Sequence, residues 1–178
     1  MTDRAVVASR PLDGDTPRPV FLYGSLMADP VYDSVMRAGL TSYERPRKVA
    51  PARLAGFRRF GVTGAPYPAI VAAGPDDSVE GVLSFVRTAA EVELLDVFET
   101  SMYRRETVET TVAESWGMRT VEADVFVWNK DPALLDGKPW DFDNFLAHRM
   151  AEWMQVETGS GGQPLVATAD GVVASEAS

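Results

Sequence analysis

Two segments in which apolar and polar residues alternate dominate the second half of the chain. They span residues 107–112 and 120–128, and the loop between them begins AESWGM. Alternation with a period of two is typical of a strand that has one buried face and one solvated face. We therefore expect an antiparallel pair whose buried face carries Val121, Ala123, Val125 and Val127.

Shorter apolar runs predict the remaining strands, at residues 20–23, 54–62, 67–71 and 79–86. The last of these runs contains a glycine that can mark a bulge. Helices are expected from an N-cap at Asp29 to Gly39, from Thr88 onwards, and from about Asp141 onwards. Because strands outnumber helices and do not alternate regularly with them, the pattern favours an α+β fold over a doubly wound sheet.

The chain is expected to form one domain, because 178 residues are enough for one sizeable core and few for two. Residues 1–18 are rich in Pro, Asp, Thr and Arg and lack aromatic residues, which predicts a flexible segment. Residues 158–178 are rich in Gly, Ser, Ala and Thr, which predicts a disordered tail, with a short strand possible at residues 164–168. The domain itself is expected to span residues 19–157.

Charge and apolar content bear on partners and location. The formal net charge of −9 argues against a nucleic-acid or anionic-membrane partner, because both require clustered Lys and Arg. No apolar run has the length of a membrane span, and the first residues lack the apolar core of a signal peptide. Together with the absence of Cys, which suits a reducing compartment, these features predict a cytoplasmic protein.

The last predicted helix has an apolar stripe formed by Phe142, Phe145, Leu146, Met150 and Trp153. Arg149 falls inside this stripe, so its side chain is expected either to extend to solvent or to meet a carboxylate. His148, the only histidine, points away from the stripe and is interpreted as a surface imidazole. With no Cys and one such His, thiol nucleophiles and His/Cys metal clusters lack their side chains, and no metal or cofactor site is recognisable.

The segment that begins at Thr88 predicts an amphipathic helix with an acid on its apolar side. Thr88 and Glu91 have the spacing of a capping box. At about 100° per residue, Glu99 falls on the same stripe as Val92 and Leu95, so a helix that persists to its end holds Glu99 against the core.

A carboxyl group in that position is a candidate general acid/base. Loss of hydration disfavours its charged form and raises its pKa towards neutrality, where a carboxylate is a useful base. Because Cys is absent and His148 is expected in solvent, carboxylates are the leading acid–base candidates, and Glu99 is the first of them. The alternative is that the helix frays after Phe98 and leaves Glu99 solvated.

The sequence YGSL, at residues 23–26, directly follows a predicted buried strand. A Gly–Ser pair there makes a tight turn that can leave backbone N–H groups unpaired and convergent, and such groups can hold a carboxylate or an oxyanion. The alternative is an ordinary turn.

Several ordered stretches resemble the gamma-glutamylcyclotransferase-like family, especially its avirulence-induced-gene branch, which includes gamma-glutamylamine cyclotransferases. They are VFLYGSLM, YPAI, VEGVLSFV, LLDVFETSMYRRETV and WDFDNFLAHRMAEWM, and together they cover about residues 20–154. The resemblance implies a small mixed β-barrel flanked by helices. It also implies a pocket whose floor is formed by Tyr23, Gly24, Ser25 and Leu26, with an acid at the position of Glu99.

In family members that are enzymes, a gamma-glutamyl compound cyclises to 5-oxoproline and releases its amine, without a cofactor or metal. The resemblance therefore implies a small gamma-glutamyl substrate, with Glu99 as general acid/base. The family's Tyr–x–Arg pattern after the acid is matched by Tyr103 and Arg105, whereas the glycine that commonly follows the acid is replaced by Thr100. That departure can alter how Glu99 is presented.

The alternative function is a pocket that binds an amino-acid-like ligand without chemistry, or a partner-binding module on the same fold; Thr100 is the feature that favours it. Tyr103 is expected either to line the pocket through its hydroxyl or to pack at the helix–strand corner. Tyr67, which precedes Pro68, is interpreted as a strand residue. The four Trp are assigned to packing, with Trp116 exposed in its loop. The sequence indicates neither the released amine nor an oligomeric state.

Overall fold

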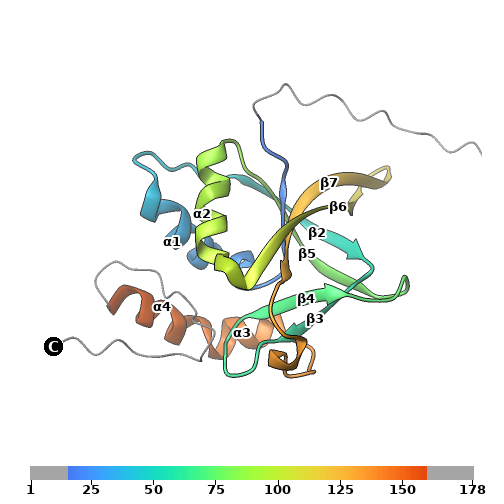
Figure 1. The fold of residues 1–178 in the computed structure, drawn as a ribbon. Coiled ribbons are helices and arrows are strands. Elements are labelled where there is room, and N and C mark those ends of the chain that lie inside the picture. The colour runs from blue at the N-terminus through green and yellow to red at the C-terminus, as the bar shows by residue number, and fades with distance from the viewer. Residues whose placement is uncertain (1–15, 160–178) are drawn as a thin grey trace, which may run out of the picture.

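A closed barrel of five strands forms the centre of the computed structural model, which describes residues 16–159 (Figure 1). The strands are β1 (Val20–Leu22), β2 (Arg47–Ala55), β3 (Phe57–Gly61), β4 (Pro68–Ala72), β5 (Ser78–Phe85), β6 (Tyr103–Glu114) and β7 (Gly117–Trp128). The barrel order is β1-β5-β2-β6-β7, and a parallel pairing of β1 with β7 closes it. Strands β3 and β4 form a separate antiparallel pair.

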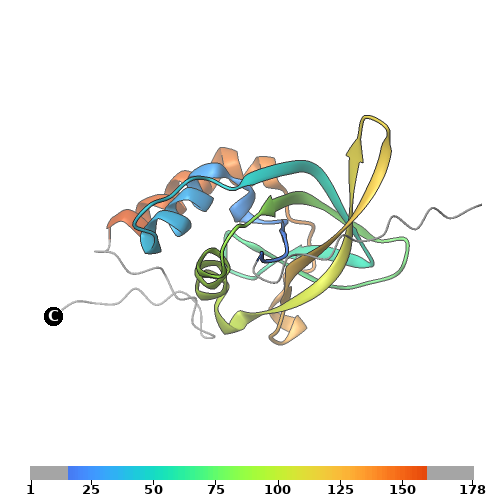
Figure 2. The same cartoon turned by 90° about the horizontal axis from the view of Figure 1, so that it is seen from above.

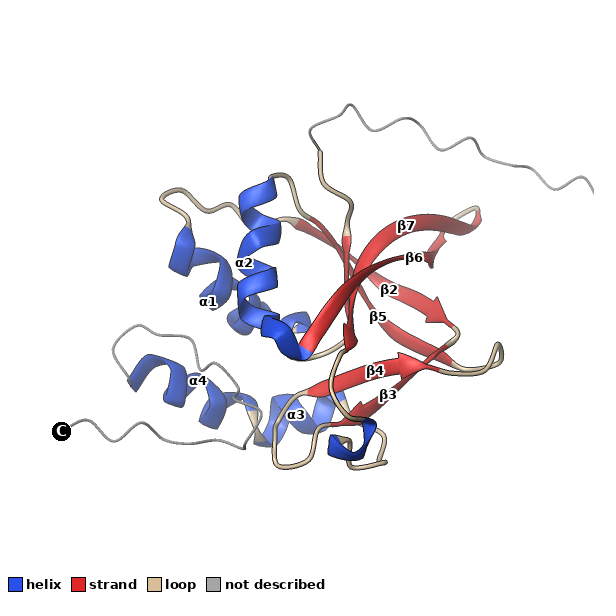
Figure 3. Ribbon diagram, in the orientation of Figure 1, coloured by secondary structure: helices blue, strands red, loops and turns tan. Residues whose placement is uncertain are grey.

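Within the described residues, four α-helices accompany the strands: α1 (Asp29–Gly39), α2 (Ala89–Glu99), α3 (Phe142–His148) and α4 (Met150–Gly159). Three short 3-10 turns are η1 (Ser25–Met27), η2 (Thr100–Met102) and η3 (Pro132–Leu134). Helices α1, α2 and α4 lie on one side of the barrel, and the β6–β7 hairpin extends away on the other (Figures 2 and 3). The predicted α+β class, with a small mixed barrel flanked by helices, is confirmed.

The predicted antiparallel pair is β6 and β7, whose register runs from Tyr103 opposite Trp128 to Glu114 opposite Gly117. It is longer than the alternating segments suggested, because residues on both sides continue the ladder. All four residues expected on the buried face of β7 belong to one core cluster. Trp116, in the turn of the hairpin, is 83% exposed, as expected.

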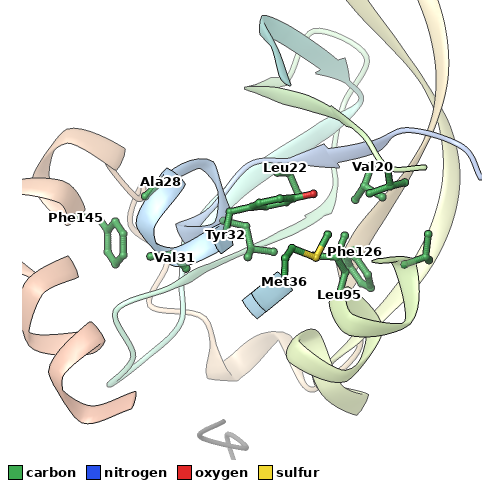
Figure 4. Packing of buried hydrophobic residues seen from close by; sticks show 12 residues of the cluster. Val20, Leu22, Ala28, Val31, Tyr32, Met36, Leu95, Phe126 and Phe145 are labelled. Carbon is green, nitrogen blue, oxygen red and sulfur yellow. The ribbon is translucent and has the colours of Figure 1, made fainter. Parts of the chain in front are cut away.

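Two apolar clusters meet at β1, whose successive residues point to opposite faces. Phe21 joins the cluster formed by the strands, whereas Val20 and Leu22 join the cluster shared with the helices. Figure 4 shows this second cluster, where Tyr32 and Met36 of α1 pack near Leu95 of α2. Strand β1 therefore lies between the barrel interior and the helical layer.

The expectation of one strand over residues 54–62 is wrong. Gly56 has a positive φ of 80° and separates β2 from β3, which pairs with β4. The bulge expected at Gly81 lies instead on β2, where the register shifts between Val49 and Ala52. Gly81 itself allows a close approach of β1, because a Cβ there would lie 2.2 Å from the carbonyl oxygen of Leu22.

Helix α1 ends at Gly39 as expected, but its N-cap is Ala28, not Asp29. Asp29 is the first helical residue, and its carboxylate forms ion pairs with Arg45 at 3.0 Å and Lys48 at 2.9 Å. Because Asp29 already lies inside the first turn, its side chain does not cap the helix and pairs with these two cations instead.

The last predicted helix starts after Asp141, whose side chain accepts a hydrogen bond from the N–H of Asn144 at 2.6 Å. It is two helices, because Arg149 leaves helical geometry between α3 and α4 with φ −122°. A single apolar stripe therefore does not run through both, and Leu146, expected in that stripe, is 37% exposed. The side chains of Arg149 and His148 are exposed.

No helix in residues 16–159 is long and apolar enough to span a membrane. The expectations for residues 1–15 and 160–178, including the strand at residues 164–168, lie outside the described residues.

Candidate functional site

A pocket of about 130 Å³ opens where the end of β1, the start of β4, the corner between α2 and β6, and helix α4 meet. Its lining residues are Phe21, Leu22, Tyr23, Gly24, Ser25, Leu26, Pro66, Tyr67, Pro68, Phe98, Glu99, Thr100, Met102, Tyr103, Phe126 and Trp153. All the residues of the predicted site are among them. Glu99 is the only carboxylic acid in this lining, which contains no Lys, Arg or His.

Glu99 is the last residue of α2, so the helix does not fray after Phe98. The helix begins at its predicted cap, where Thr88 Oγ1 accepts a hydrogen bond from the N–H of Glu91 at 3.2 Å. The Glu91 carboxylate accepts the N–H of Arg87 at 2.6 Å, one residue before the position that a capping box usually engages.

Glu99 is partly exposed as a residue, and its carboxyl group lies buried in the wall of the pocket. Burial raises its pKa from an ordinary value of 4.5 to about 8, and no cation of the described chain counters this effect. A group with this pKa exchanges its proton readily near neutral pH, so it can serve as an acid and as a base in one cycle.

Thr100 turns the chain directly after Glu99. Its backbone has φ 59° and ψ −169°, a region that residues with a side chain rarely adopt and that glycine adopts readily. The N–H of Thr100 donates to the carbonyl of Asp96, and its Oγ1 accepts the N–H of Met102 at 3.3 Å. These bonds hold Thr100 in place despite the unfavourable backbone conformation.

The YGSL loop enters the 3-10 turn η1. Within it, Met27 N–H donates to the carbonyl of Gly24 and Ala28 N–H donates to that of Ser25, both at 3.0 Å. The N–H groups of Ser25 and Leu26 come before the first donor of the turn, so the turn itself leaves them without a partner. The loop thus carries two backbone donors at the wall of the pocket.

Two further contacts fix this loop. Arg59 donates from Nη1 to the carbonyl oxygen of Tyr23 at 2.6 Å. Gly24 packs against the ring of Pro68, where an added Cβ would lie 3.0 Å from two ring carbons.

Tyr23 and Tyr103 both donate their hydroxyl protons to the protein. Tyr23 bonds the carbonyl of Phe126 at 2.6 Å, and Tyr103 bonds that of Pro68 at 2.8 Å. The ring of Tyr103 also packs edge-on against Trp128, so its two expected roles, lining the pocket and packing at the corner, coexist. Burial, together with the nearby Glu99, raises the pKa of both hydroxyls well above their ordinary value.

Tyr67 was interpreted from the sequence as a strand residue, and its position in the pocket was not predicted. Strand β4 begins one residue later, at Pro68, and the half-buried Tyr67 side chain lines the pocket. Its hydroxyl has no hydrogen-bond partner among residues 16–159. Burial and the proximity of Glu99 raise its pKa. The signal in the sequence is the place of Tyr67 directly before a predicted strand, where a side chain is less bound to the pattern of the sheet.

Phe98 and Trp153 also line the pocket, and the sequence assigned them only to apolar stripes. Their rings meet edge to face, with centroids 5.8 Å apart. A helical stripe does not reveal whether its partner is a packed core or the wall of a cavity.

Across the described residues there is no group of three or more His, Cys, Asp or Glu side chains that could hold a metal ion. Within residues 16–159 the pocket offers one proton-transfer group, the hydroxyls of Ser25 and Tyr67 without a hydrogen-bond partner, two backbone donors and a large apolar surface. This combination suits proton transfer on a small, polar ligand whose conformation is fixed by the walls.

Comparison with known proteins agrees with this architecture. The family model described as gamma-glutamyl cyclotransferase, AIG2-like, matches residues 20–142. AIG2-like protein D of Arabidopsis thaliana is 36% identical over 139 residues, which cover 77% of this chain and 84% of the relative.

Solved structures show the same fold. The solution structure of an Arabidopsis thaliana protein, 25% identical, superimposes with a TM-score of 0.58 over 85% of this chain and 98% of the other. A yeast gamma-glutamyl cyclotransferase specific to glutathione, 16% identical, has a TM-score of 0.52 and covers 70% of this chain and 74% of its own. The chain belongs to the AIG2-like family of gamma-glutamyl cyclotransferases.

Proposed function

We propose that the protein converts a gamma-glutamyl amide to 5-oxoproline and a free amine, with Glu99 as the general acid/base. The observation that carries the proposal is the convergence of Glu99 and the YGSL loop on one pocket. The reaction needs no nucleophile from the protein, because the α-amine of the substrate attacks its own γ-carbonyl carbon. Such a reaction depends chiefly on orientation and on proton transfer from the attacking nitrogen to the departing one.

The first step is removal of a proton from the substrate's α-ammonium group. A cation that approaches Glu99 favours the ionised carboxylate and so offsets part of the effect of burial. Glu99 then accepts the proton as the nitrogen forms a bond to the γ-carbonyl carbon, and the carbonyl oxygen becomes an oxyanion. The N–H groups of Ser25 and Leu26 serve as donors to this oxyanion or to the α-carboxylate.

The second step breaks the bond between the γ-carbon and the departing nitrogen. Glu99 returns its proton to that nitrogen and the carbonyl reforms, while the ring nitrogen gives up its second proton, through Glu99 or water, to the released amine; 5-oxoproline and an ammonium ion result. The free hydroxyl of Tyr67 is available to donate a hydrogen bond to the substrate, whereas those of Tyr23 and Tyr103 are engaged with backbone carbonyls. These two tyrosines shape the pocket and position its floor.

The absence of Cys supports the proposal that the reaction takes place in the cytoplasm.

The test is release of 5-oxoproline from a panel of gamma-glutamyl amines, gamma-glutamyl amino acids and glutathione. Wild-type protein should turn over at least one compound, and Glu99→Gln, a nearly isosteric change, should lose turnover by about a hundredfold or more while its fold is retained. Turnover by the variant at the wild-type rate would exclude Glu99 as the base. No product from either folded protein, with ligand-induced stabilisation of both, would instead favour binding without chemistry.

A further inference from the structure

Every carbonyl oxygen of the YGSL loop and of the next residue, Met27, has a hydrogen-bond donor. Two of these oxygens accept N–H groups within η1. The other three, of Tyr23, Leu26 and Met27, accept from the side chains of Arg59 and Lys48. Because the C=O and N–H of a trans peptide point in opposite directions, bonds that fix the carbonyls also fix the direction of the N–H groups. The loop can therefore present N–H groups to an anion without also presenting a carbonyl oxygen.

Arg59, on β3, holds the start of the loop. Its Nη1 donates to the carbonyl oxygen of Tyr23 at 2.6 Å, and its guanidinium carbon lies 5.2 Å from the ring centroid of Trp140. Within residues 16–159, no carboxylate oxygen lies within ion-pairing distance of this partly buried side chain. Burial lowers the pKa of Arg59, because the charged form loses hydration. A cation kept here without a carboxylate partner has the loop carbonyl and an aromatic face as its partners.

Lys48, on β2, holds the other end of the loop. Its Nζ lies 3.3 Å from the carbonyl oxygen of Leu26, 3.5 Å from that of Met27 and 2.9 Å from Oδ1 of Asp29. The same atom lies 4.3 Å from the ring centroid of Tyr32. An ammonium group has three N–H donors, and these three oxygens match that number. Lys48 therefore ties the end of η1 to the first turn of α1.

We infer that Arg59 and Lys48 are positioning residues that hold the YGSL loop in the conformation that binds an anion. Neither side chain lines the pocket, so both act through the backbone of the loop and not on the substrate. They also place positive charge near a pocket whose own lining contains no Lys or Arg. This inference rests on the proposed function, because it assigns the two cations to the donor loop of that reaction.

Substitutions at Arg59 test the start of the loop. Arg59→Met removes the donor and keeps an apolar stem, whereas Arg59→Lys keeps a charged donor. We expect Arg59→Met to lower kcat/KM at least about tenfold, and Arg59→Lys to lose clearly less, because the bond to Tyr23 can be made again. Arg58→Met, the same change one residue earlier, removes an ion pair with Asp77 at 2.6 Å and should keep the wild-type value. Wild-type kcat/KM in folded Arg59→Met, or equal losses in Arg59→Met and Arg59→Lys, would overturn the role of this charge.

Substitutions at Lys48 test the other end, and they decide the question independently if Arg59→Met does not fold. Lys48→Met should lower kcat/KM about fivefold or more. Arg47→Met, at the exposed preceding residue, should keep the wild-type value. Asp29→Asn weakens the ion pair and leaves the bonds from Lys48 to the loop in place, so it should also stay near the wild-type value. An unchanged kcat/KM in folded Lys48→Met, or an equal loss in Asp29→Asn, would overturn the inference for Lys48.

A measurement on the ligand-free protein separates this inference from the proposed function. The nitrogen-15 chemical shift of Gly24 responds to the hydrogen bond on the carbonyl of Tyr23, because both atoms belong to one peptide group. This shift should move further in Arg59→Met than in Arg58→Met or Arg59→Lys. If no gamma-glutamyl compound yields 5-oxoproline, the proposed function fails, while the shift still reports whether Arg59 holds the loop. Equal shifts in Arg59→Met and Arg58→Met would overturn the inference whatever the reaction.

Discussion

Thr100 follows Glu99 directly and reverses the sign of φ, from −74° at the acid to 59° at the threonine. Helix α2 therefore stops at the carboxyl group that lines the pocket, and the chain turns through η2 into β6. Glycine is the residue that adopts such a conformation without strain. The residue here is threonine, and the chain nevertheless makes the turn that a glycine would make without strain.

Replacement of Thr100 by Gly should stabilise the protein. A residue with a side chain in this backbone region costs about 1–3 kcal/mol, and the loss of the hydrogen bond from Met102 and the greater freedom of glycine in the unfolded chain offset part of the gain. We expect the free energy of unfolding to rise by about 1 kcal/mol, measured by chemical denaturation. Ser101→Gly, at a position without a positive φ, should lower it; a Thr100→Gly protein less stable than wild type would show that no strain is stored there.

The pH dependence of activity should reflect the raised pKa of Glu99. Only the ionised carboxylate accepts a proton, so kcat/KM should rise with pH along an acid limb whose midpoint lies at about 8. A fully solvated glutamate would place the midpoint near 4.5. The measurement is a profile of initial rates at low substrate concentration from about pH 3.5 to 10. A midpoint between 4 and 5 would be incompatible with the buried position of the catalytic group.

The free energy of unfolding should fall as pH rises, because of the same group, whereas activity should rise. Between about pH 4.5 and 8 the unfolded chain releases the Glu99 proton while the folded protein retains it, so stability falls as pH rises through this window. The full shift corresponds to at most about 5 kcal/mol, and the opening of the pocket to water reduces it. Below the window both states hold the proton, and above it both have lost it.

Denaturation of wild type and Glu99→Gln at pH 5 and pH 8 measures this effect. The glutamine variant has no proton to release at this position, so its loss of stability over the interval should be smaller by a few kcal/mol. Parallel declines in the two proteins would mean that Glu99 titrates normally in the folded state.

Tyr67→Phe and Tyr103→Phe should separate catalysis from stability. Because the Tyr67 hydroxyl has no partner in the described chain, its removal should leave the free energy of unfolding within about 0.5 kcal/mol and lower kcat/KM about tenfold. Tyr103→Phe leaves the carbonyl of Pro68 without its donor and should cost about 1 kcal/mol of stability. Unchanged kinetics in Tyr67→Phe would exclude a bond from this hydroxyl to the substrate.

The elements of the fold could be predicted from the sequence where local pattern and tertiary environment agree. The hairpin of β6 and β7 has one buried face along its length, so alternation identified both strands. Pattern alone failed at Gly56, where one apolar run belongs to two strands in different sheets. It also failed at Leu146, because the chain leaves helical geometry at Arg149 and α3 and α4 do not share one continuous stripe.

Part of the candidate site could be predicted from the sequence, because two of its features depart from the pattern around them. Glu99 was identified because a charge on an apolar stripe conflicts with the periodicity around it, and the YGSL loop because glycine and serine end a buried strand. Tyr67, Phe98 and Trp153 cause no such conflict, since aromatic residues suit a core and a pocket wall equally. Their role depends on how α4 and the start of β4 come together in space, which periodicity does not describe.

Strand β1 has only three residues, yet it pairs with β5 on one side and with β7 on the other, and it leads directly into the YGSL loop. The floor of the pocket therefore cannot open unless the barrel itself opens. The hydrogen-bonded amide protons of β1 should exchange with solvent only as slowly as global unfolding allows. Helix α4, which joins no sheet, forms the opposite wall. In the proposed reaction, the barrel side of the pocket would stay fixed, and any adjustment of the pocket to substrate or product would come from the α4 side.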